Sequence, residues 1–322
     1  MERKTLEAAC DVIRRGRTFI IACHIRPDGD TLGSGIALWL ALNGLGKKAW
    51  IVSVDGVPDP WGFLPHTDVL LASAPKEDFD VAIAVDADGI ERVGDARPAV
   101  ESARTVISID HHAGAAPFGD VRVHDPKAAA TAELVIEILD ILNVPIDTDI
   151  ATCLMAGIIG DTGAFRFTNV TPRTFETAAR LLRAGASSSE IARRVYEDRS
   201  LIATKVLGHV LADLRTSIGE AIVWGSVSLE DFAALGASDE HTDGVVNFIL
   251  AVQGARVGLL FREYPDGTVR VSLRSNGDID VSKIANIFGG GGHAAAAGCT
   301  VEGNLATAEE RVVDEVAKWM GY

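Results

Sequence analysis

Three short apolar runs in the first half of the chain end abruptly in a histidine or an acidic residue. The runs, each with the polar residue that ends it, are Ile20–Cys23 with His24, Phe79–Val85 with Asp86, and Arg104–Ile109 with Asp110. Short runs that are rich in β-branched residues and bounded by turn residues are typical of buried strands. Because helical segments alternate with such strands, the pattern favours an α/β fold with a mostly parallel sheet covered by helices on both faces.

The remaining periodicity predicts further helices and a second sheet near the end of the chain. We predict helices over Thr31–Leu45, Ala128–Asn143, Asp147–Ile159, Thr171–Ala184, Ser189–Leu214, Val281–Phe288 and Ala306–Met320. We predict further strands over Lys48–Val54, Glu220–Val227, Ala255–Glu263 and Thr268–Arg274, with a hairpin turn at Pro265-Asp266-Gly267. We expect an α/β domain at residues 1–186, a helical linker at 187–217 and a smaller mixed α/β domain at 218–322, with the active-site cleft between the two domains.

The size and composition of the chain fit a globular protein with two domains. The chain has 322 residues, of which 48% are hydrophobic, so it can bury substantial cores. Its formal net charge of −15 argues against a continuous basic surface for long nucleic acid, because contacts to phosphates dominate such binding. A short anionic substrate fits this charge, since local arginines or bound metal ions reverse the field within a site.

The cysteine pattern and the N-terminal sequence do not predict a zinc site or a signal peptide. The four cysteines are scattered and form no Cys-x-x-Cys pair, so we expect buried free thiols rather than a zinc site. Residues 1–7 predict the start of an amphipathic helix and lack the apolar segment of a signal peptide. No stretch is apolar for long enough to predict a membrane span. We therefore expect a cytoplasmic protein without a membrane partner.

The polar residues at the strand ends are expected to meet at one edge of the sheet. They are His24, Asp28, Asp30, Asp86, Asp110, His111 and His112, and Asp161 is placed to reach the same edge from the end of a helix. Crowded carboxylates repel one another unless cations compensate them. Carboxylate and imidazole ligands without a thiolate suit Mn²⁺ or Mg²⁺ better than structural zinc. Taken alone, Asp30 or Thr31 is equally well explained as a helix N-cap.

The number of candidate ligands favours two divalent ions. Two ions about 3.5–4 Å apart need a bridging carboxylate, and they activate water while stabilising both the attacking and the leaving oxygen of an in-line displacement. Asp86 stands alone at the end of the middle strand and is the candidate bridge. The chemistry that fits such a centre is hydrolysis of phosphate esters or anhydrides.

Four motifs together resemble those of the DHH phosphoesterase family. They are His24-x-x-x-Asp28-x-Asp30, Asp86, Asp110-His111-His112 and Gly160-Asp161-Thr162-Gly163. A fifth segment, Gly289-Gly290-Gly291-Gly292-His293, is similar to the substrate-binding domain associated with that family. The motifs extend over nearly the whole chain. One catalytic and one associated domain, without a further module, resemble the nanoRNase and 3′-phosphoadenosine-5′-phosphate phosphatase branch.

The resemblance implies a role for each residue at the sheet edge. The two ligand sets are His24, Asp28 and Asp86 for one Mn²⁺ ion, and Asp30, Asp86, His111 and Asp161 for the other. Mg²⁺ and Co²⁺ are alternative metals. His112 would lie close to the scissile phosphate, with Asp110 beside it as a second catalytic residue. The alternative for this pair is that it only caps or braces the end of the strand.

The second domain carries the candidate residues for substrate binding. Consecutive glycines allow backbone amides to approach an anion closely. Arg274 lies on one face of its strand by alternation. Its guanidinium group is a candidate to donate two hydrogen bonds to a terminal phosphate. The alternative is a solvated arginine at the end of a strand. By resemblance the substrate-binding residues are Arg274, Ser275, Gly290, Gly291, Gly292 and His293, and we add Asn247.

The resemblance implies a Mn²⁺-dependent phosphoesterase with small nucleic-acid substrates. Its substrates would be short RNA oligonucleotides, which it degrades, and nucleoside 3′,5′-bisphosphates, which it dephosphorylates. The alternatives are hydrolysis of cyclic or linear dinucleotides, and a nucleotide sensor that binds metal without turnover. Long duplex nucleic acid is not expected as a partner, and a homodimer stays open as the oligomeric state.

Overall fold

The computed structural model describes residues 3–114 and 118–322 and divides into two compact units, the first ending at Asp198 and the second beginning at Arg199. Met1 and Glu2, which begin the predicted amphipathic helix, lie outside the described residues, as does the side chain of His293. The predicted domain boundaries, and a cleft between the domains, stay predictions. In the part of the chain that is described, no helix is both long and apolar enough to cross a membrane.

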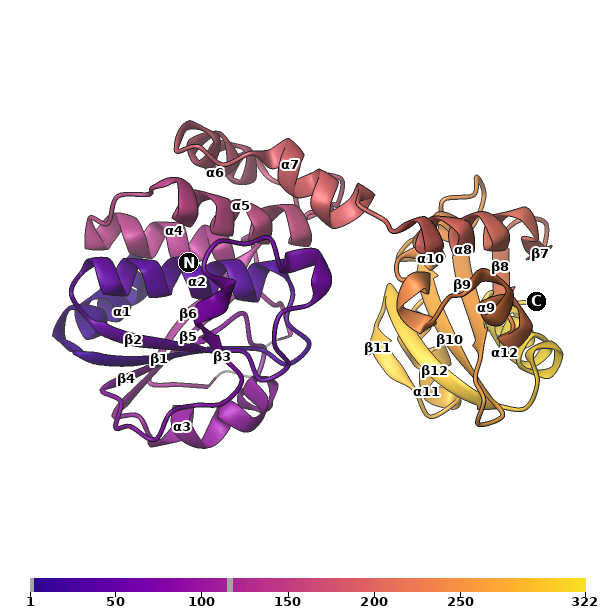
Figure 1. The fold of residues 1–322 in the computed structure, drawn as a ribbon, viewed down its shortest axis with the longest axis horizontal. Helices are drawn as coiled ribbons and strands as arrows, with labels where there is room; N and C mark the ends of the chain where they lie inside the picture. Colours follow the sequence, from indigo (N-terminus) through magenta and orange to yellow (C-terminus); the bar gives the residue numbers. More distant parts are fainter. Residues whose placement is uncertain (1–2, 115–117) are drawn as a thin grey trace. The chain divides into compact units, whose positions relative to one another are not determined.

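A parallel sheet of six strands forms the centre of the first unit (Figure 1), with the strand order β3-β2-β1-β4-β5-β6. The strands are β1 (Thr18–Cys23), β2 (Lys48–Val52), β3 (Leu70–Leu71), β4 (Val81–Val85), β5 (Thr105–Asp110) and β6 (Val121–His124). Every residue of β4 is buried, and so is nearly every residue of β1, as expected of central parallel strands. The prediction of a mostly parallel sheet is confirmed, although the short strands β3 and β6 were not predicted.

Helices cover both faces of this sheet (Figure 1). One face packs against α1 (Arg3–Arg15), α2 (Gly29–Gly44), α4 (Thr131–Leu142) and α5 (Thr148–Asp161), and the opposite face packs against α3 (Arg97–Ser102). Phe19 and Ile21 belong to the first core, whereas Ile20 and Ala22 belong to the second. Successive side chains of a strand point to opposite faces, which is why the central strands are apolar at every position.

The strand order creates a switch point next to the predicted metal ligands. The chain proceeds outward from β1 through β2 to β3, and then crosses to β4 on the other side of β1. Open α/β sheets bind ligands at such a point, outside the carboxyl ends of the strands. The register pairs Cys23 with Val85, so His24 and Asp86 each follow one residue after the same pair. The fold therefore brings the first and second motifs together.

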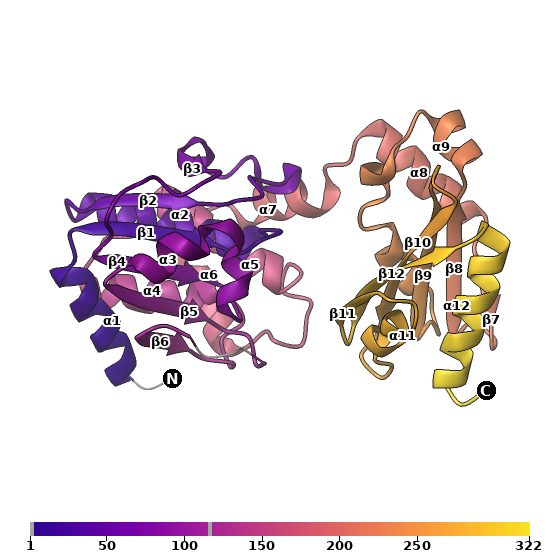
Figure 2. The same ribbon diagram turned by 90° about the horizontal axis from the view of Figure 1, so that it is seen from below.

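A mixed sheet of six strands forms the second unit (Figure 2), in the order β11-β12-β10-β9-β8-β7. The strands are β7 (Arg215–Ser217), β8 (Ile222–Val227), β9 (Val257–Glu263), β10 (Thr268–Ser275), β11 (Gly291–His293) and β12 (Ala296–Glu302). The pair β8 and β9 is parallel, and the other neighbouring pairs are antiparallel. Helices α11 (Val281–Ile287) and α12 (Leu305–Trp319) pack on one face, and α8 (Leu201–Ala212) and α10 (Val245–Leu250) on the other.

The segment between the two sheets differs from its predicted form. The sequence predicts a helix over Ser189–Leu214 that is mildly broken around Asp198–Leu201, and the structure interrupts the helix there, but more completely. After α6 (Pro172–Arg183), the structure instead has α7 (Ser188–Ala192), a turn of π-helix at Arg193–Glu197, and then α8. The helices separate because Ser200 acts as a new N-cap, its side chain accepting a hydrogen bond from the amide of Ala203.

Part of the glycine-rich segment Gly289–His293 forms a strand. Gly291–His293 is strand β11, and the alanine run that follows enters strand β12. Glycine and alanine have low strand propensity, so their sequence gave no strand signal. Their small size is nevertheless required here, because a Cβ atom on Gly290 would lie 2.1 Å from the carbonyl oxygen of Gly298.

All four cysteines are free and buried, as predicted. Burial raises the pKa of Cys10 and Cys299 to about 11 and that of Cys23 to about 12. Because the thiolate is the reactive form, we expect the folded protein to react with iodoacetamide at pH 8 about 100-fold or more slowly than the unfolded chain. Mass spectrometry of alkylated sites checks this, and rapid modification of any cysteine in the folded protein would contradict it.

Candidate metal centre

The loop after β1 brings together the first group of predicted ligands. The Nε2 atom of His24 lies 3.4 Å from Oδ2 of Asp86 and 3.6 Å from Oδ1 of Asp28. The other ring nitrogen, Nδ1, lies 2.8 Å from the carbonyl oxygen of Ile25. A histidine that donates one N–H to a carbonyl group keeps its second nitrogen for a metal. His24, Asp28 and Asp86 therefore form one group that could hold a cation, with ligand atoms within 4.8 Å of one another.

The start of α2 corrects the predicted helix cap. Asp28 is the N-cap, since its Oδ1 accepts hydrogen bonds from the amides of Asp30 at 3.0 Å and Thr31 at 3.2 Å. The alternative explanation of Asp30 or Thr31 as the cap is wrong, because the helix begins earlier, at Gly29. Asp30 is fully buried within the first turn, where its carboxylate accepts hydrogen bonds from the amides of Thr131 and Ala132.

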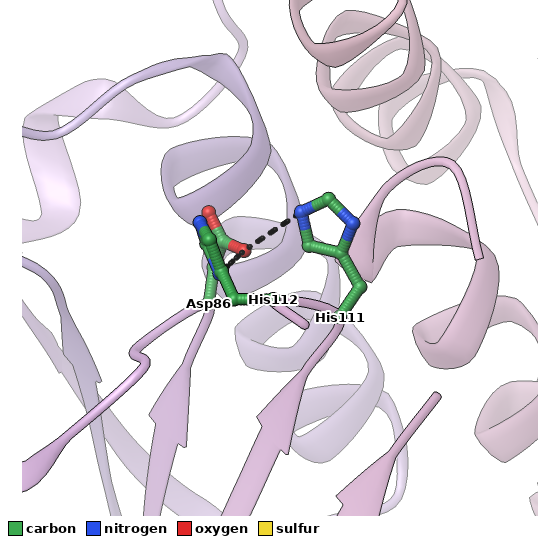
Figure 3. A group of neighbouring side chains, drawn as sticks. All are labelled: Asp86, His111 and His112. Carbon is green, nitrogen blue, oxygen red and sulfur yellow. Dashed lines mark ion pairs between the residues drawn. The ribbon is translucent and has the colours of Figure 1, made fainter. Parts of the chain in front are cut away.

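Asp86 lies at the centre of the cluster, between two histidines. Its Oδ2 atom faces His24, whereas its Oδ1 atom lies 3.6 Å from Nε2 of His111 (Figure 3). The side chain is 2% exposed, and the backbone has a φ of 58°, a value that residues with a Cβ atom rarely adopt. Such a conformation is typical of functional sites, where the surrounding structure stabilises it. Each carboxylate oxygen thus faces a different histidine, which is the arrangement that a bridging ligand needs.

A second group of ligands surrounds His111. Its Nε2 atom lies 2.9 Å from Oδ2 of Asp161, the last residue of α5, and its Nδ1 atom lies 3.2 Å from the carbonyl oxygen of Ala128. The ring is therefore oriented like that of His24, with one nitrogen at a carbonyl group and the other toward carboxylates. Asp30, His111 and Asp161 form another group that could hold a cation.

The charges of the cluster fit a cation centre. Burial, together with neighbouring carboxylates, raises the pKa of Asp30 well above its usual range, and burial raises that of Asp161 to about 6. Burial opposes the charge of His24 and His111, but hydrogen bonds to carboxylates outweigh it and raise each pKa to about 10. The carboxylates thus stabilise positive charge beside them, whether a protonated imidazole or a metal ion carries it. Oxygen and imidazole ligands without a thiolate suit Mn²⁺ or Mg²⁺.

Asp110 and His112 form a pair next to this cluster. Oδ1 of Asp110 lies 2.7 Å from Nδ1 of His112, and its other oxygen accepts a hydrogen bond from the His112 amide at 3.3 Å. The hydrogen bond to Asp110 raises the pKa of His112 above its usual value. Because Nδ1 donates to Asp110, Nε2 is the ring nitrogen left for a substrate. Asp110 therefore braces His112, and the ring lies beside the cluster, with Nδ1 3.7 Å from Oδ1 of Asp86.

The structure adds a residue that was not predicted, Thr131. Its hydroxyl group donates a hydrogen bond to Oδ1 of Asp86 at 2.9 Å, and its amide donates to Oδ2 of Asp30 at 2.5 Å. No local pattern could have indicated these contacts, because Thr131 lies 101 residues after Asp30 in the chain. The predicted helix began at Ala128, whereas the true start at Thr131 aims these two donors at the cluster.

The predicted substrate residues of the second unit have different environments. Arg274 is half-buried in β10, and its Nη1 atom donates to the carbonyl oxygen of Leu273 at 3.0 Å. Burial, and then the nearby charge of Arg262, lower the pKa of Arg274. Ser275 is buried, and its hydroxyl group donates to the carbonyl oxygen of Ile279 at 2.6 Å. That hydroxyl group therefore stabilises the turn after β10.

The strand register relates Arg274 to the glycine-rich segment. Arg274 of β10 and His293 of β11 both pair with Ala296 of β12, so the three residues lie in one row across the sheet. Gly291 and Gly292 precede His293 in β11, and the amide of Gly290 donates to Ala285. Asn247 lies exposed on α10, which packs on the face of the sheet opposite α11 and α12.

A hollow of about 290 Å³ lies beside the glycine-rich segment. Its lining includes Arg262, Arg270, Ser272, Gly289 and Gly290. Arg270 and Ser272 lie on the same face of β10 as Arg274 by alternation, whereas Arg262 comes from β9 and was not predicted as a site residue. This hollow therefore combines two guanidinium groups with glycine backbone.

Comparison with known proteins identifies the family. Residues 18–158 match the N-terminal domain of the DHH family, and residues 227–321 match the DHHA1 domain. Over 300 residues the chain is 37% identical to the bifunctional oligoribonuclease and PAP phosphatase NrnA of Thermus thermophilus, covering 92% of this chain and 88% of that protein. The chain belongs to the DHH phosphoesterase family.

Two further comparisons agree with this assignment. The protein of the same name from Bacillus subtilis is 30% identical over 291 residues, which are 88% of this chain and 89% of that protein. A crystal structure of an exopolyphosphatase-related protein from Bacteroides fragilis shares the fold, with a TM-score of 0.89, 22% identity, and coverage of 99% of this chain and 96% of that chain. The predicted DHH family, α/β fold and class of hydrolytic phosphoesterase are confirmed.

Proposed function

We propose that this DHH phosphoesterase hydrolyses short RNA oligonucleotides and nucleoside 3′,5′-bisphosphates with the help of two divalent ions. Mn²⁺ is the first candidate for both ions. The observation that carries the proposal is the position of Asp86, whose two oxygens face different histidines. The relatives named oligoribonuclease and PAP phosphatase support the substrate class. A cytoplasmic location and the oligomeric state stay predictions.

The residues of the first unit would hold two ions with one shared ligand. The proposed sets are His24, Asp28 and Asp86 for one ion, and Asp30, Asp86, His111 and Asp161 for the other. When bound, the ions would activate water and neutralise charge on the reacting phosphate. Thr131 keeps Asp86 oriented by donating to Oδ1, and the carbonyl groups at Nδ1 keep both imidazoles turned toward the carboxylates.

His112 would act as the general acid in this site. Asp110 accepts the Nδ1 proton of His112 and thereby fixes the ring. The raised pKa keeps His112 protonated to higher pH, so the Nε2 proton is available for the leaving oxygen of the substrate. The bracing contact and the catalytic role are thus compatible.

The second unit would bind the part of the substrate that does not react. Among the described residues Arg274 has no carboxylate partner, and its half-buried guanidinium group offers a fork that matches a phosphate group. The hollow beside the glycine-rich segment adds Arg262, Arg270 and the backbone of Gly289 and Gly290.

Replacing Arg274 by alanine should weaken substrate binding and leave the chemical step intact. Hydrogen bonds to charged groups contribute about 1.5–3 kcal/mol, so we expect KM to rise about 10- to 100-fold while kcat changes little. Steady-state kinetics with a nucleoside 3′,5′-bisphosphate measures both constants. The matched control is Lys318→Ala, since Lys318 is an exposed cation on α12, on the other face of the sheet. An unchanged KM for Arg274→Ala would remove Arg274 from the binding site.

A substrate series tests the proposed function. The purified protein with Mn²⁺ is assayed on 3′-phosphoadenosine-5′-phosphate, on RNA of two to five nucleotides, on cyclic di-AMP, on pyrophosphate and on long single-stranded RNA. We expect turnover of the bisphosphate and of the short RNA. Inactivity on both of these substrates would contradict the proposal. Selective cleavage of cyclic di-AMP would favour the cyclic dinucleotide alternative, and tight binding without any turnover would favour the sensor.

A further inference from the structure

One loop contacts three of the proposed metal ligands. It is the β6–α4 loop, residues 125–130, together with the first residue of α4. The three contacts join the carbonyl group of Ala128 to Nδ1 of His111, the hydroxyl group of Thr131 to Asp86, and the amide of Thr131 to Asp30. These ligands belong to different motifs, so the position of this single loop determines how they are oriented relative to one another.

Arg173, on α6, holds both ends of this loop. Its Nη1 atom donates to Oδ2 of Asp125 at 3.0 Å, at the start of the loop. Its Nε atom lies 3.1 Å from Oε2 of Glu133, in the first turn of α4, and its Nη2 atom lies 2.8 Å from Oε1 of Glu137. The same oxygen of Glu133 faces the amide of Ala129, at 3.4 Å. One planar guanidinium group therefore connects the loop, the helix after it and α6.

The contacts of Arg173 are buried enough to matter energetically. Glu133 is 1% exposed and Asp125 is 6% exposed. Burial raises the pKa of Glu133, which shows that its charge is costly at this place. Arg173 pairs with the carboxylates of Asp125, Glu133 and Glu137. Removing one partner of a buried ion pair leaves an uncompensated charge, so without Arg173 the buried charge of Glu133 would displace the first turn of α4 and the loop that precedes it.

We propose that Arg173 is a positioning residue for the metal centre, acting through the β6–α4 loop on His111, Asp86 and Asp30. The proposal rests on the proposed function, because it presupposes that these three residues bind metal. Arg173 contributes no ligand itself. Its role is to keep the Ala128 carbonyl group and the Thr131 donors at the distances that orient the ligands.

A matched control is available on the same helix. Arg180 of α6 also pairs with a carboxylate of α4, that of Asp140, with Nη1 2.6 Å from Oδ2. This second pair joins the same two helices but lies at the far end of α4, away from the loop. Replacing Arg180 therefore reports the loss of a helix–helix ion pair alone, whereas replacing Arg173 reports that loss together with a displaced loop.

The test measures Mn²⁺ binding to the full-length protein by isothermal titration calorimetry, alongside thermal unfolding without metal. Loss of the groups that orient metal ligands typically costs 10- to 100-fold in affinity, so we expect about that loss for Arg173→Gln and less than about 2-fold for Arg180→Gln. Arg173→Lys keeps the positive charge but not the planar guanidinium group, so we expect about a 3- to 10-fold loss in Mn²⁺ affinity. Electron paramagnetic resonance of bound Mn²⁺ should show an altered spectrum for the two Arg173 variants only.

Mn²⁺ affinity and spectrum equal to wild type in the Arg173 variants would overturn the inference, and so would an equal loss in Arg180→Gln. If Arg173→Gln does not fold, the comparison of Arg173→Lys with Arg180→Gln decides the matter in the same way. Failure of the proposed function has a different signature, because the wild-type protein would then turn over neither the bisphosphate nor the short RNA, whatever its Mn²⁺ affinity. A wild-type protein that binds Mn²⁺ beside an unaffected Arg173→Lys variant would contradict the positioning role alone.

Discussion

The Asp86→Ala variant is expected to lose at least about 1,000-fold in kcat, together with most of its bound metal. The oxygens of Asp86 face His24 and His111 separately, so its removal takes one ligand from each proposed ion and separates the two sets. Metal activation contributes several kcal/mol to such reactions, and about 4 kcal/mol corresponds to a factor of about 1,000 in rate. Turnover of a nucleoside 3′,5′-bisphosphate and metal content after gel filtration measure the two losses.

The control for this variant is Asp88→Ala. Asp88 follows in the same loop, but its side chain is 41% exposed and pairs with Arg92 at 3.5 Å. It should retain activity within a few-fold of wild type, because exposed ion pairs contribute little. Full activity and unchanged metal content in Asp86→Ala would remove Asp86 as the bridge. A loss in Asp88→Ala equal to that in Asp86→Ala would attribute both effects to the loop as a whole.

Replacing His112 by glutamine is expected to lower kcat by about 100- to 10,000-fold while the metal content stays the same. Proton transfer by a positioned side chain contributes that much to rates, and Asp110 holds the ring through Nδ1. The test is kcat together with metal analysis. His112 belongs to neither of the two proposed ligand sets, so loss of metal in His112→Gln would contradict its assignment as an acid.

The dependence on the leaving group sharpens the test of His112. A general acid matters little when the leaving group is already a weak base, such as p-nitrophenolate. We therefore expect His112→Gln to lose much less activity on a p-nitrophenyl nucleotide than on RNA. An equal loss on both substrates would show that His112 acts in some other way. Asp110→Asn should show the same pattern with a smaller loss, because it weakens the hydrogen bond that fixes the ring.

The sheet of the first unit could be predicted because its strands carry a strong local signal. Central parallel strands are buried on both faces, so β1, β4 and β5 appear in the sequence as short β-branched runs that end in polar residues. The parallel order then places those polar ends at one edge. For this reason the meeting of His24, Asp86 and His111 followed from local patterns and one rule of topology.

The helix cap and the glycine strand could not be predicted in the same way. Asp28 and Asp30 are both acidic residues near the start of a helix, and only the backbone of Gly29 decides that the earlier one is the cap. Strand β11 consists of two glycines and a histidine, whose propensity opposes a strand. It forms because the backbone approaches β12 closely, and such an approach depends on residues distant in the sequence.

The residues that orient the proposed metal ligands could not be predicted from local sequence patterns either. Thr131 and Arg173 lie in segments whose own sequence predicts only helices. The significance of Thr131 comes from contacts to motifs far earlier in the chain, and that of Arg173 from its ion pairs with the loop before Thr131 and with the helix that follows. Metal ligands are recognised by residue type and spacing, whereas the groups that orient them have no fixed type. Sequence patterns therefore indicate the ligands of such a centre more readily than the residues that position them.

The most direct measurement of the central claim is a crystal structure of the protein soaked with Mn²⁺, with anomalous data collected at the manganese edge. We expect two anomalous peaks in each chain, with one oxygen of Asp86 toward each peak. The ligands around the first peak would include His24, and those around the second peak would include His111. A single peak, or two peaks of which Asp86 touches only one, would contradict the proposed two-ion centre.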